Sequence, residues 1–429
     1  MKGSLQRLEG RDYAGALAKL EKPQGKTNKL LYHFEKGLIL HYQGEYEGSN
    51  REFARAEKLI DRLYTRSISR EIAALVTNDA IRAYSGEEFE RTFVHYYRAM
   101  NYQYLGRPQE ALVECRKANL RLEQYAAASE YELSYKNDAF LQYMTGLFFE
   151  AEGELNDAYV SYKDAEKGYR AYAEIFGLQV PRMLARDLAN LARRMGYAED
   201  LDAYIKRYRL DPAELSAARG GEVIIFVESG FVSRKRQNEI EMPIMEDDDT
   251  GDVWLLSDRM VYRYRRYGHR SHNKVKYWLK VALPYIEIIP TEVSQVRLRG
   301  AGKSVEGVLV DNLNAIAGEN FREKEDGILL RTIARGLAKY AMAQKVKDKN
   351  EVLGYLVNLL GNSTETADTR SWLSLPSHIR IARFSLPPGT VDLVLEFLNR
   401  GGQVVDSTHF PEVEVKADKA VFLSCRSYR

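Results

Sequence analysis

The sequence predicts an α+β protein. An irregular α-solenoid is expected over residues 1–218, followed by a β-rich domain over 219–429 with a helical insertion at about 304–362. Three observations predict this fold. Glycine, aromatic and alanine residues recur together in the first half, and apolar residues there are spaced three and four apart, as in amphipathic helices. After Gly220-Gly221 the pattern changes to short apolar runs between glycine and proline turns.

Length and composition restrict the number of domains and the class of protein. With 429 residues, two or three domains are expected. No apolar run approaches the roughly 18 residues of a transmembrane helix, and the first residues lack the apolar core of a secretion signal. We therefore expect either a cytoplasmic protein or an exported one whose signal has been trimmed. Two cysteines exclude a disulfide framework, and with seven scattered histidines they predict no metal site.

The helical half contains a repeat of uneven length. Its copies are marked by the glycines Gly10, Gly44, Gly106, Gly153 and Gly196, which lie 34, 62, 47 and 43 residues apart. The first interval equals the tetratricopeptide period, so the repeats are predicted to be stacked helix pairs of that kind. The longest interval has room for an additional helix, at about 66–84, that would cap or fill the inner face.

In tetratricopeptide arrays the first helix of each pair lines the concave face. By position, that face would present mostly aromatic side chains with a few polar groups, namely Phe34, His41, Phe93, Tyr96, Gln103 and Tyr143. A groove of this composition suits a peptide or an amphipathic helix of a protein partner. Because these positions are mostly apolar, the alternative is that they pack against the additional helix or the second half.

The second half is predicted to be an antiparallel, sandwich-like β domain. The apolar run at 223–227, between Glu222 and Glu228, predicts a buried strand over 222–228. The acidic loop at 246–252 is expected to be exposed. Further strands are expected at 253–265, 276–283, 285–289, 293–299, 379–384, 391–398, 403–408, 413–415 and 421–425. The short connections between most of them favour antiparallel pairing.

One basic segment in this half is rich in aromatic residues. Residues 259–280 contain no Asp or Glu, and they interleave tyrosines with basic side chains that include Arg263, Arg265, Arg266, Arg270 and Lys274. Such a segment can bind an anionic glycan or a phospholipid surface. Nucleic acid is not expected as a partner, although the net charge of +2 argues neither for nor against it. The alternative is a hairpin whose solvated basic face pairs with the neighbouring acids.

No catalytic, cofactor-binding or metal-binding residue is predicted. The segment 300–304 resembles a phosphate-binding loop, but Arg297 stands where that motif needs its first glycine, so a turn is expected. His269 and His272 have no acid or cysteine nearby, and no serine lies in a Gly-x-Ser-x-Gly elbow.

Three segments, at 95–106, 221–230 and 369–389, resemble a family of largely uncharacterised bacterial envelope proteins with tetratricopeptide-like repeats. The most specific part is Asp368-Thr-Arg-Ser-Trp372 with Leu-Pro-Pro-Gly389. The resemblance implies a lipoprotein of the periplasm or outer membrane with a binding role and no cofactor, although no lipoprotein cysteine precedes the first helix. Arg370 and Trp372 are expected either to form a binding site or to lock the inserted helices onto the β domain.

The sequence therefore predicts a non-enzymatic adaptor or scaffold of the bacterial cell envelope. It would bind protein partners through the solenoid, and the β-rich domain would either dock a second partner or assemble with copies of itself. One alternative is a binder of an anionic polymer or membrane surface through 259–280. Another is an enzyme of cell-wall metabolism, and a cytoplasmic location is the alternative to the envelope.

Overall fold

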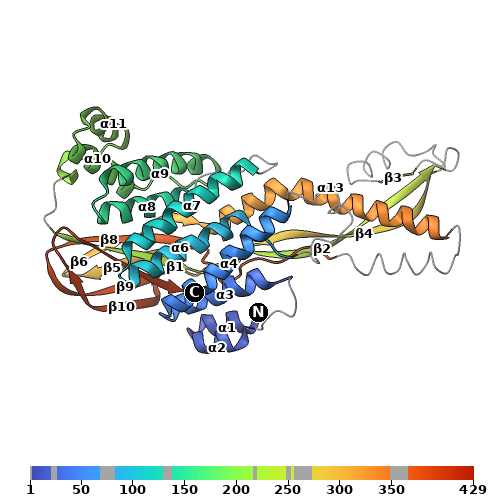
Figure 1. Ribbon diagram of the computed structural model, residues 1–429, viewed down its shortest axis with the longest axis horizontal. Coiled ribbons are helices and arrows are strands. Elements are labelled where there is room, and N and C mark those ends of the chain that lie inside the picture. Colours follow the sequence, from blue (N-terminus) through green and yellow to red (C-terminus); the bar gives the residue numbers. More distant parts are fainter. Residues whose placement is uncertain are drawn as a thin grey trace.

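The computed structural model describes residues 2–20, 27–67, 83–128, 138–215, 220–247, 253–255, 273–347 and 366–429. It is a mixed α+β structure with a broad body and an arm that extends from it (Figure 1). We define the arm as the strands β2, β3 and β4 with the helix α13; the body contains the remaining elements.

The first half of the chain is helical, as expected. Its elements are α1 (Lys2–Glu9), α2 (Tyr13–Lys19), α3 (Lys29–Tyr42), α4 (Tyr46–Ser67), α6 (Glu88–Tyr104), α7 (Pro108–Ala128), α8 (Ala139–Ala151), α9 (Leu155–Ile175), α10 (Arg182–Met195), α11 (Ala198–Tyr208) and the 3₁₀ turn η2 (Pro212–Leu215). Consecutive helices pack as pairs: α3 with α4, α6 with α7, α8 with α9, and α10 with α11.

The repeated glycines make the turns within these pairs. Gly44, Gly106, Gly153 and Gly196 all adopt positive φ between 68° and 83°, a conformation that glycine reaches without steric cost. At the earliest copy Arg11, not Gly10, takes the left-handed conformation, with φ of 55°. The repeat therefore correctly predicts the helix pairs and most of their turns.

The described strands of the second half form three sheets. These strands are β1 (Gly221–Ser229), β2 (Arg234–Asp247), β3 (Val253–Leu255), β4 (Asn273–Glu287), β5 (Gln295–Gly300), β6 (Lys303–Glu306), β7 (Val308–Asn312), β8 (His378–Leu386), β9 (Gly389–Leu398), β10 (Val404–Val415) and β11 (Ala420–Ser427). Two body sheets have the orders β11-β1-β8-β7 and β10-β9-β5-β6, and the arm sheet is β3-β2-β4. Pairing is antiparallel except between β1 and β11, which run parallel.

Strand β1 joins the layers of the body because both of its faces are buried. Val223, Ile225 and Val227 point into the core between the two body sheets. Ile224 and Phe226 point the other way, into a core shared with the helices. The order is therefore helices, first sheet, second sheet, and one hydrophobic core runs from the helical half into the β half. A strand buried on both faces explains the unbroken apolar run in its sequence.

Several element boundaries differ from those expected. The predicted strands 276–283 and 285–289 form the single strand β4, and 403–408 with 413–415 form β10, whose pairing with β9 is interrupted by bulges. Residues 303–312 are mostly in strands, so the inserted helix begins later, with α13 (Leu313–Lys347). Most of the predicted strand 253–265, and the end of the insertion, lie outside the described residues.

The turn at 300–304 is a tight hairpin between β5 and β6. Ala301 and Gly302 both adopt positive φ, at 49° and 70°, which is the backbone of a two-residue type I′ turn. The lysine and serine that follow are paired in β6. This agrees with the expected turn and differs from the strand–loop–helix setting of a phosphate-binding loop.

The arm projects away from the body. Strands β2 and β4 pair along most of their length, and α13 runs beside them, with β3 at the far end (Figure 1). At the other end Leu313 and Ile316 of α13 are buried in the helical core. The arm is thus anchored by the start of its helix.

Candidate functional site

The inner face of the helical array is closed by the chain itself. Phe34, His41, Phe93, Tyr96 and Tyr143 are at most 4% exposed, and Gln103 is partly buried. The ring of Phe226 on β1 lies 6.5 Å from that of Tyr96 and 6.1 Å from that of Phe140. The open groove that we expected is therefore filled. Tyr96 packs against the second half, as the alternative expects, as does Phe34, whose ring stacks on that of Trp372.

Polar groups on this face are also occupied by the chain. Tyr96 donates a hydrogen bond of 3.0 Å to the buried carboxylate of Glu228 on β1, and Tyr143 donates one of 2.7 Å to Asp187 on α10. The Nδ1 atom of His41 lies 2.6 Å from Oδ1 of Asn101, and burial lowers the pKa of this imidazole. A partner could reach the Tyr96 hydroxyl only by displacing Glu228 of β1.

Trp372 and Arg370 belong to the packing that closes this face. Trp372 is fully buried, and its ring stacks on Phe34 with the centroids 4.5 Å apart. Arg370 forms an ion pair of 2.7 Å with Asp368. Trp372 is buried and Arg370 is paired, as the locking alternative expects, but Trp372 packs against helices of the first half rather than fastening the inserted helix to the sheets.

The basic–aromatic segment is only partly described. Arg263, Arg265, Arg266 and Arg270 lie outside the described residues, and Lys274 is placed only as a residue of β4. His269 and His272 also lie outside them. Most of the helix expected at 66–84 also lies outside the described residues. Helix α4 ends at Ser67, and residues 68–82 are not described.

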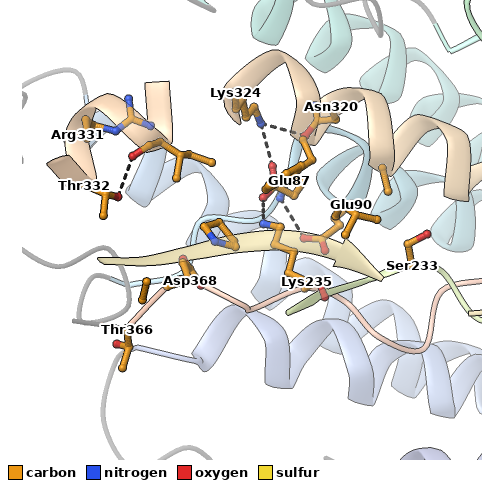
Figure 2. Close-up of a pocket in the computed structure, with 18 of the residues that line it drawn as sticks. Glu87, Glu90, Ser233, Lys235, Asn320, Lys324, Arg331, Thr332, Thr366 and Asp368 are labelled. Carbon is orange, nitrogen blue, oxygen red and sulfur yellow. Dashed lines mark hydrogen bonds and ion pairs between the residues drawn. The ribbon is translucent and has the colours of Figure 1, made fainter. Parts of the chain in front are cut away.

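A cavity of about 180 Å³ lies at the root of the arm, where the start of α6, the strands β2 and β4, and α13 meet (Figure 2). Charged and polar side chains line it together with a wall of apolar ones. The polar lining consists of Glu87, Glu90, Ser233, Lys235, Asn320, Lys324, Arg331, Thr332, Arg335, Thr366, Asp368 and Ser371.

Two lysines of the arm meet the glutamates at the start of α6. Lys235 on β2 pairs with Glu87, and Lys324 on α13 pairs with both Glu87, at 2.8 Å, and Glu88. Lys324 also donates a hydrogen bond of 3.0 Å to Asn320. Glutamates in a first helical turn are favoured by the partial positive charge of the helix end. These contacts fix the arm to the body electrostatically.

The pKa shifts of Glu87, Glu88 and Lys324 describe an ion-pair cluster. Burial alone would raise the pKa of Glu87 and Glu88, but the ammonium groups outweigh it. Lys235 and Lys324 hold the pKa of Glu87 below its usual range, and Lys324 with Arg91 lowers that of Glu88 to about 2. Burial would likewise lower the pKa of Lys324, yet the two glutamates raise it. Lys324 therefore remains a cation and does not supply a free amine for nucleophilic attack.

The carboxylates of the cavity all have donors. Both oxygens of Glu87 accept from lysines. Glu90 accepts from Tyr84 Oη at 2.5 Å and from the backbone amide of Trp372 at 2.6 Å. Asp368 accepts from the guanidinium of Arg370 through both of its oxygens. Every acidic group of the lining is therefore engaged by a donor of the chain itself.

Three side chains of the lining have hydrogen-bond donors that lack a partner among the described residues. Among the described residues, the ammonium of Lys235 makes a single hydrogen bond, to Glu87. The guanidinium of Arg331 has no ion pair or hydrogen bond to any residue that the structure describes. The hydroxyl of Ser371 is buried and also lacks a partner in the described part of the chain. Hydrogen-bond donors are thus left over, while the acceptors are satisfied.

Sequence reasoning missed this cavity because its residues are far apart in the chain. They come from 87–90, 233–235, 282–286, 317–335 and 366–371. The acidic run Glu87-Glu88-Phe89-Glu90 before an apolar helix was a readable signal for a helix start, and the first and last of these glutamates form a capping box. Nothing in the sequence indicates which lysines meet them.

Family models and curated proteins give no functional assignment for this chain. Within the described ranges, no cluster of three or more His, Cys, Asp or Glu side chains is arranged to hold a metal ion, and none of the helices there is long and apolar enough to cross a membrane. The sequence matches no protein-family model, and no relative is found among curated proteins. The function must therefore be inferred from the chain's own geometry.

One buried acid near the site makes stability depend on pH. Glu35 on α3 is 1% exposed and accepts a hydrogen bond of 2.9 Å from the amide of Leu373; burial raises its pKa to about 8. Between about pH 4.5 and 8 the folded state holds a proton that the unfolded state releases, so stability falls as pH rises through this window. We expect Glu35→Gln to remove this loss.

The check is urea unfolding of both proteins at pH 5 and pH 8.5. The free energy of unfolding of Glu35→Gln, relative to the parent, should rise by a few kcal/mol between the two values. A difference that is the same at both pH values would contradict a raised pKa at Glu35.

Proposed function

We propose that this chain is a non-enzymatic adaptor or scaffold that makes its partner contacts through the arm. The observation that carries the proposal is the arm itself, which extends from the body (Figure 1). It also presents large apolar side chains to solvent. Trp278 is 51% exposed, Val275 45% and Leu330 67%. Tryptophan is enriched among the residues that contribute most binding free energy at protein interfaces.

The inner face of the helices is filled by the chain itself. This supports a partner-binding site on the arm instead of on that face. In this proposal the helical half is a tetratricopeptide-like solenoid whose concave face serves the protein's own architecture. The partner is an envelope protein or a second copy of the chain, and the protein resides in the periplasm or at the outer membrane, as the family resemblance implies. Cell fractionation tests the location, which a purely cytoplasmic distribution would contradict.

Site-specific photocrosslinking tests the arm as the contact site. Trp278 is replaced by a benzophenone amino acid in the cells from which the gene comes, and the same change at Tyr197 serves as the control. Tyr197 is 42% exposed on the body, so both positions are accessible. We expect an adduct of defined mass from position 278 and none from position 197.

The identity of the adduct then decides the kind of partner. A product of twice the chain mass means self-assembly, and any other mass is identified by peptide sequencing. No adduct from the arm, or the same adducts from both positions, would contradict the proposal.

A second candidate function is attachment to an anionic membrane surface through the basic–aromatic segment. Strand β3 and the first residues of β4, which bracket this segment, lie at the far end of the arm (Figure 1). The last 21 residues of α13 also contain no acid and five basic residues: Arg331, Arg335, Lys339, Lys345 and Lys347. Basic clusters of this density attract anionic headgroups.

Vesicle co-sedimentation tests the second candidate. Binding to phosphatidylglycerol vesicles should fall steeply as NaCl increases and should be absent from phosphatidylcholine vesicles. Changing Arg263, Arg265, Arg266 and Arg270 to glutamine should weaken it by at least ~10-fold, because each basic residue near such a surface contributes about 1 kcal/mol. Salt-independent binding, or none, would contradict this function.

A further inference from the structure

One outer edge of the first sheet is not covered by another strand. Strand β11 is the end strand of that sheet, and among the described strands it pairs only with β1. Residues 420–425 of β11 are all partly exposed, whereas β1 is buried almost throughout. The outer edge of an end strand carries backbone N–H and C=O groups that have no neighbouring strand to bond.

The backbone pairing of β11 shows which of its residues face this edge. At one end the N–H of Glu222 donates to the carbonyl oxygen of Lys419 at 2.9 Å, and at the other the N–H of Gly230 donates to that of Ser427 at 3.0 Å. In a parallel ladder every second residue of a strand bonds to the neighbouring strand through both its N–H and its C=O. The odd-numbered residues of β11 therefore bond to β1, and the even-numbered ones face outward.

Three residues of this outward set have free backbone groups. The N–H and C=O groups of Ala420, Phe422 and Ser424 have no hydrogen bond to any residue that the structure describes. The next outward carbonyl, that of Arg426, accepts a hydrogen bond from the guanidinium of Arg11. One N–H and one C=O on each of three residues make six groups, so the free edge is long enough to pair with another strand.

The neighbouring edge strand is protected against pairing, whereas β11 is not. Strand β10 of the second sheet contacts β11, and its own edge carries Pro411. Glu412 beside it adopts a positive φ of 51°, where the pairing with β9 shifts between Phe410 and Val413. Proline and bulges are common devices that keep edge strands from pairing with other chains. Residues 420–425 contain no proline and no charge, and their pairing with β1 has no shift.

A groove of about 520 Å³ lies between β10 and β11. Its apolar lining includes Phe410, Val413, Val421 and Leu423. Val421 and Leu423 pack at the border of the core between the two sheets, yet both remain partly exposed. Burying them further against another apolar strand is favourable, since apolar surface is then removed from water.

We propose that β11 pairs with β11 of a second copy of the chain, antiparallel and about a two-fold axis at Phe422. In this register Phe422 faces Phe422 of the second copy, and Ala420 faces its Ser424. Between them Val421 faces its Leu423, on the side of the groove. The six outward groups of each copy then form six hydrogen bonds, two for each facing pair. The inference goes beyond the proposed adaptor function and does not depend on it, because it uses neither the arm nor the inner face of the helices.

The sequence of this edge fits a copy of itself. A two-fold interface places the same surface on both sides, so the edge strand must be self-complementary. The paired stretch is uncharged. Beyond it Lys419 would face Cys425 and Asp418 would face Arg426, so no two like charges oppose each other. These features favour a second copy over a strand of another protein.

Sedimentation velocity of the full chain tests the proposal. The parent should form a dimer of twice the chain mass, and the dimer fraction should rise with protein concentration. Val421→Lys should weaken dimerisation by at least ~10-fold, because a lysine at this edge would have to lose water beside apolar side chains. The matched control is Val160→Lys, at a residue that is 53% exposed on α9, and it should dimerise as the parent does.

Cysteine pairing tests the register, and it decides if Val421→Lys does not fold. Chains carrying Ala420→Cys are mixed with chains carrying Ser424→Cys and oxidised mildly. Facing residues of a hydrogen-bonded antiparallel pair have Cα atoms about 5.5 Å apart, a distance that a disulfide can span. We expect a disulfide-linked dimer on a non-reducing gel from the mixture, and none from either variant alone or from the parent.

Three results would overturn the proposal: a parent that stays monomeric, a Val421→Lys variant that dimerises as the parent does, or no linked dimer from the mixture. A monomeric parent would leave the edge of β11 to a strand of another protein. An unaffected Val421→Lys dimer would mean that the copies meet elsewhere, such as at the arm.

Discussion

Replacing Arg426 with methionine is expected to lower the free energy of unfolding by about 3–5 kcal/mol, as measured by urea denaturation. Arg426 on β11 and Glu228 on β1 form an ion pair in which both side chains are at most 2% exposed. Methionine fills similar space but leaves the Glu228 carboxylate buried without its cation. Removing one partner of a buried pair is strongly destabilising for that reason.

Arg426 also satisfies several other groups. Its guanidinium donates to the carbonyl oxygens of Gly230, at 2.5 Å, and Ser374, at 3.2 Å, and to Tyr42 Oη on α3 at 3.0 Å. The ring of Tyr428 lies 5.0 Å away. These contacts join the first sheet to the helices. Their loss should therefore destabilise both halves of the chain.

The double variant Arg426→Met/Glu228→Gln is the matched control. Neutralising Glu228 removes the unpaired charge, so the double variant should be more stable than Arg426→Met by at least about 1 kcal/mol. If Glu228→Gln destabilises the parent and the single variant by the same amount, the two side chains are not coupled and the expected loss at Arg426 has another cause.

Changing Trp372 to alanine is expected to cost about 3–5 kcal/mol through the cavity that it leaves. The indole is fully buried, and its ring contacts Phe34 on α3, Phe53 on α4 and Tyr97 on α6, with centroid distances of 4.5, 5.8 and 6.0 Å. Its Nε1 atom donates to Ser374 Oγ at 3.1 Å. Urea unfolding measures the loss.

Trp278 provides the comparison within the same chain. Because it is about half exposed, Trp278→Ala should change the free energy of unfolding by no more than about 0.5 kcal/mol. Equal losses for the two tryptophans would contradict the burial of Trp372 in the helical core. In the crosslinking test, Trp278 can thus be changed without unfolding the protein.

The sequence was informative where structure is local. The glycine turns of the helix pairs and the buried strand β1 could be predicted from spacing and composition, because each depends on neighbouring residues. Strand β2 was missed, since its first residues, Arg234 to Asn238, are polar and lack the alternation of a half-buried strand. Lys235 there faces the cavity rather than solvent, and periodicity does not distinguish these two cases.

The site was harder to predict because it depends on which surfaces meet. The aromatic face of the helices was identified from position, but the sequence does not show that Phe226 and Trp372 fill it. Ion pairs such as Lys324 with Glu87 join residues 237 positions apart. Local patterns carry no information on contacts of that range, so neither the filled groove nor the cavity could be deduced.

Native-state hydrogen exchange tests most directly the central claim that β1 closes the inner face of the helices as part of one core. The slowest amides of α6, α8 and β1 should open with one common free energy, equal to that of global unfolding, because their side chains share a hydrophobic core. If β1 instead opened at a clearly lower free energy while α6 and α8 stayed protected, a partner could enter the vacated groove, and the claim of a permanently closed inner face would be contradicted.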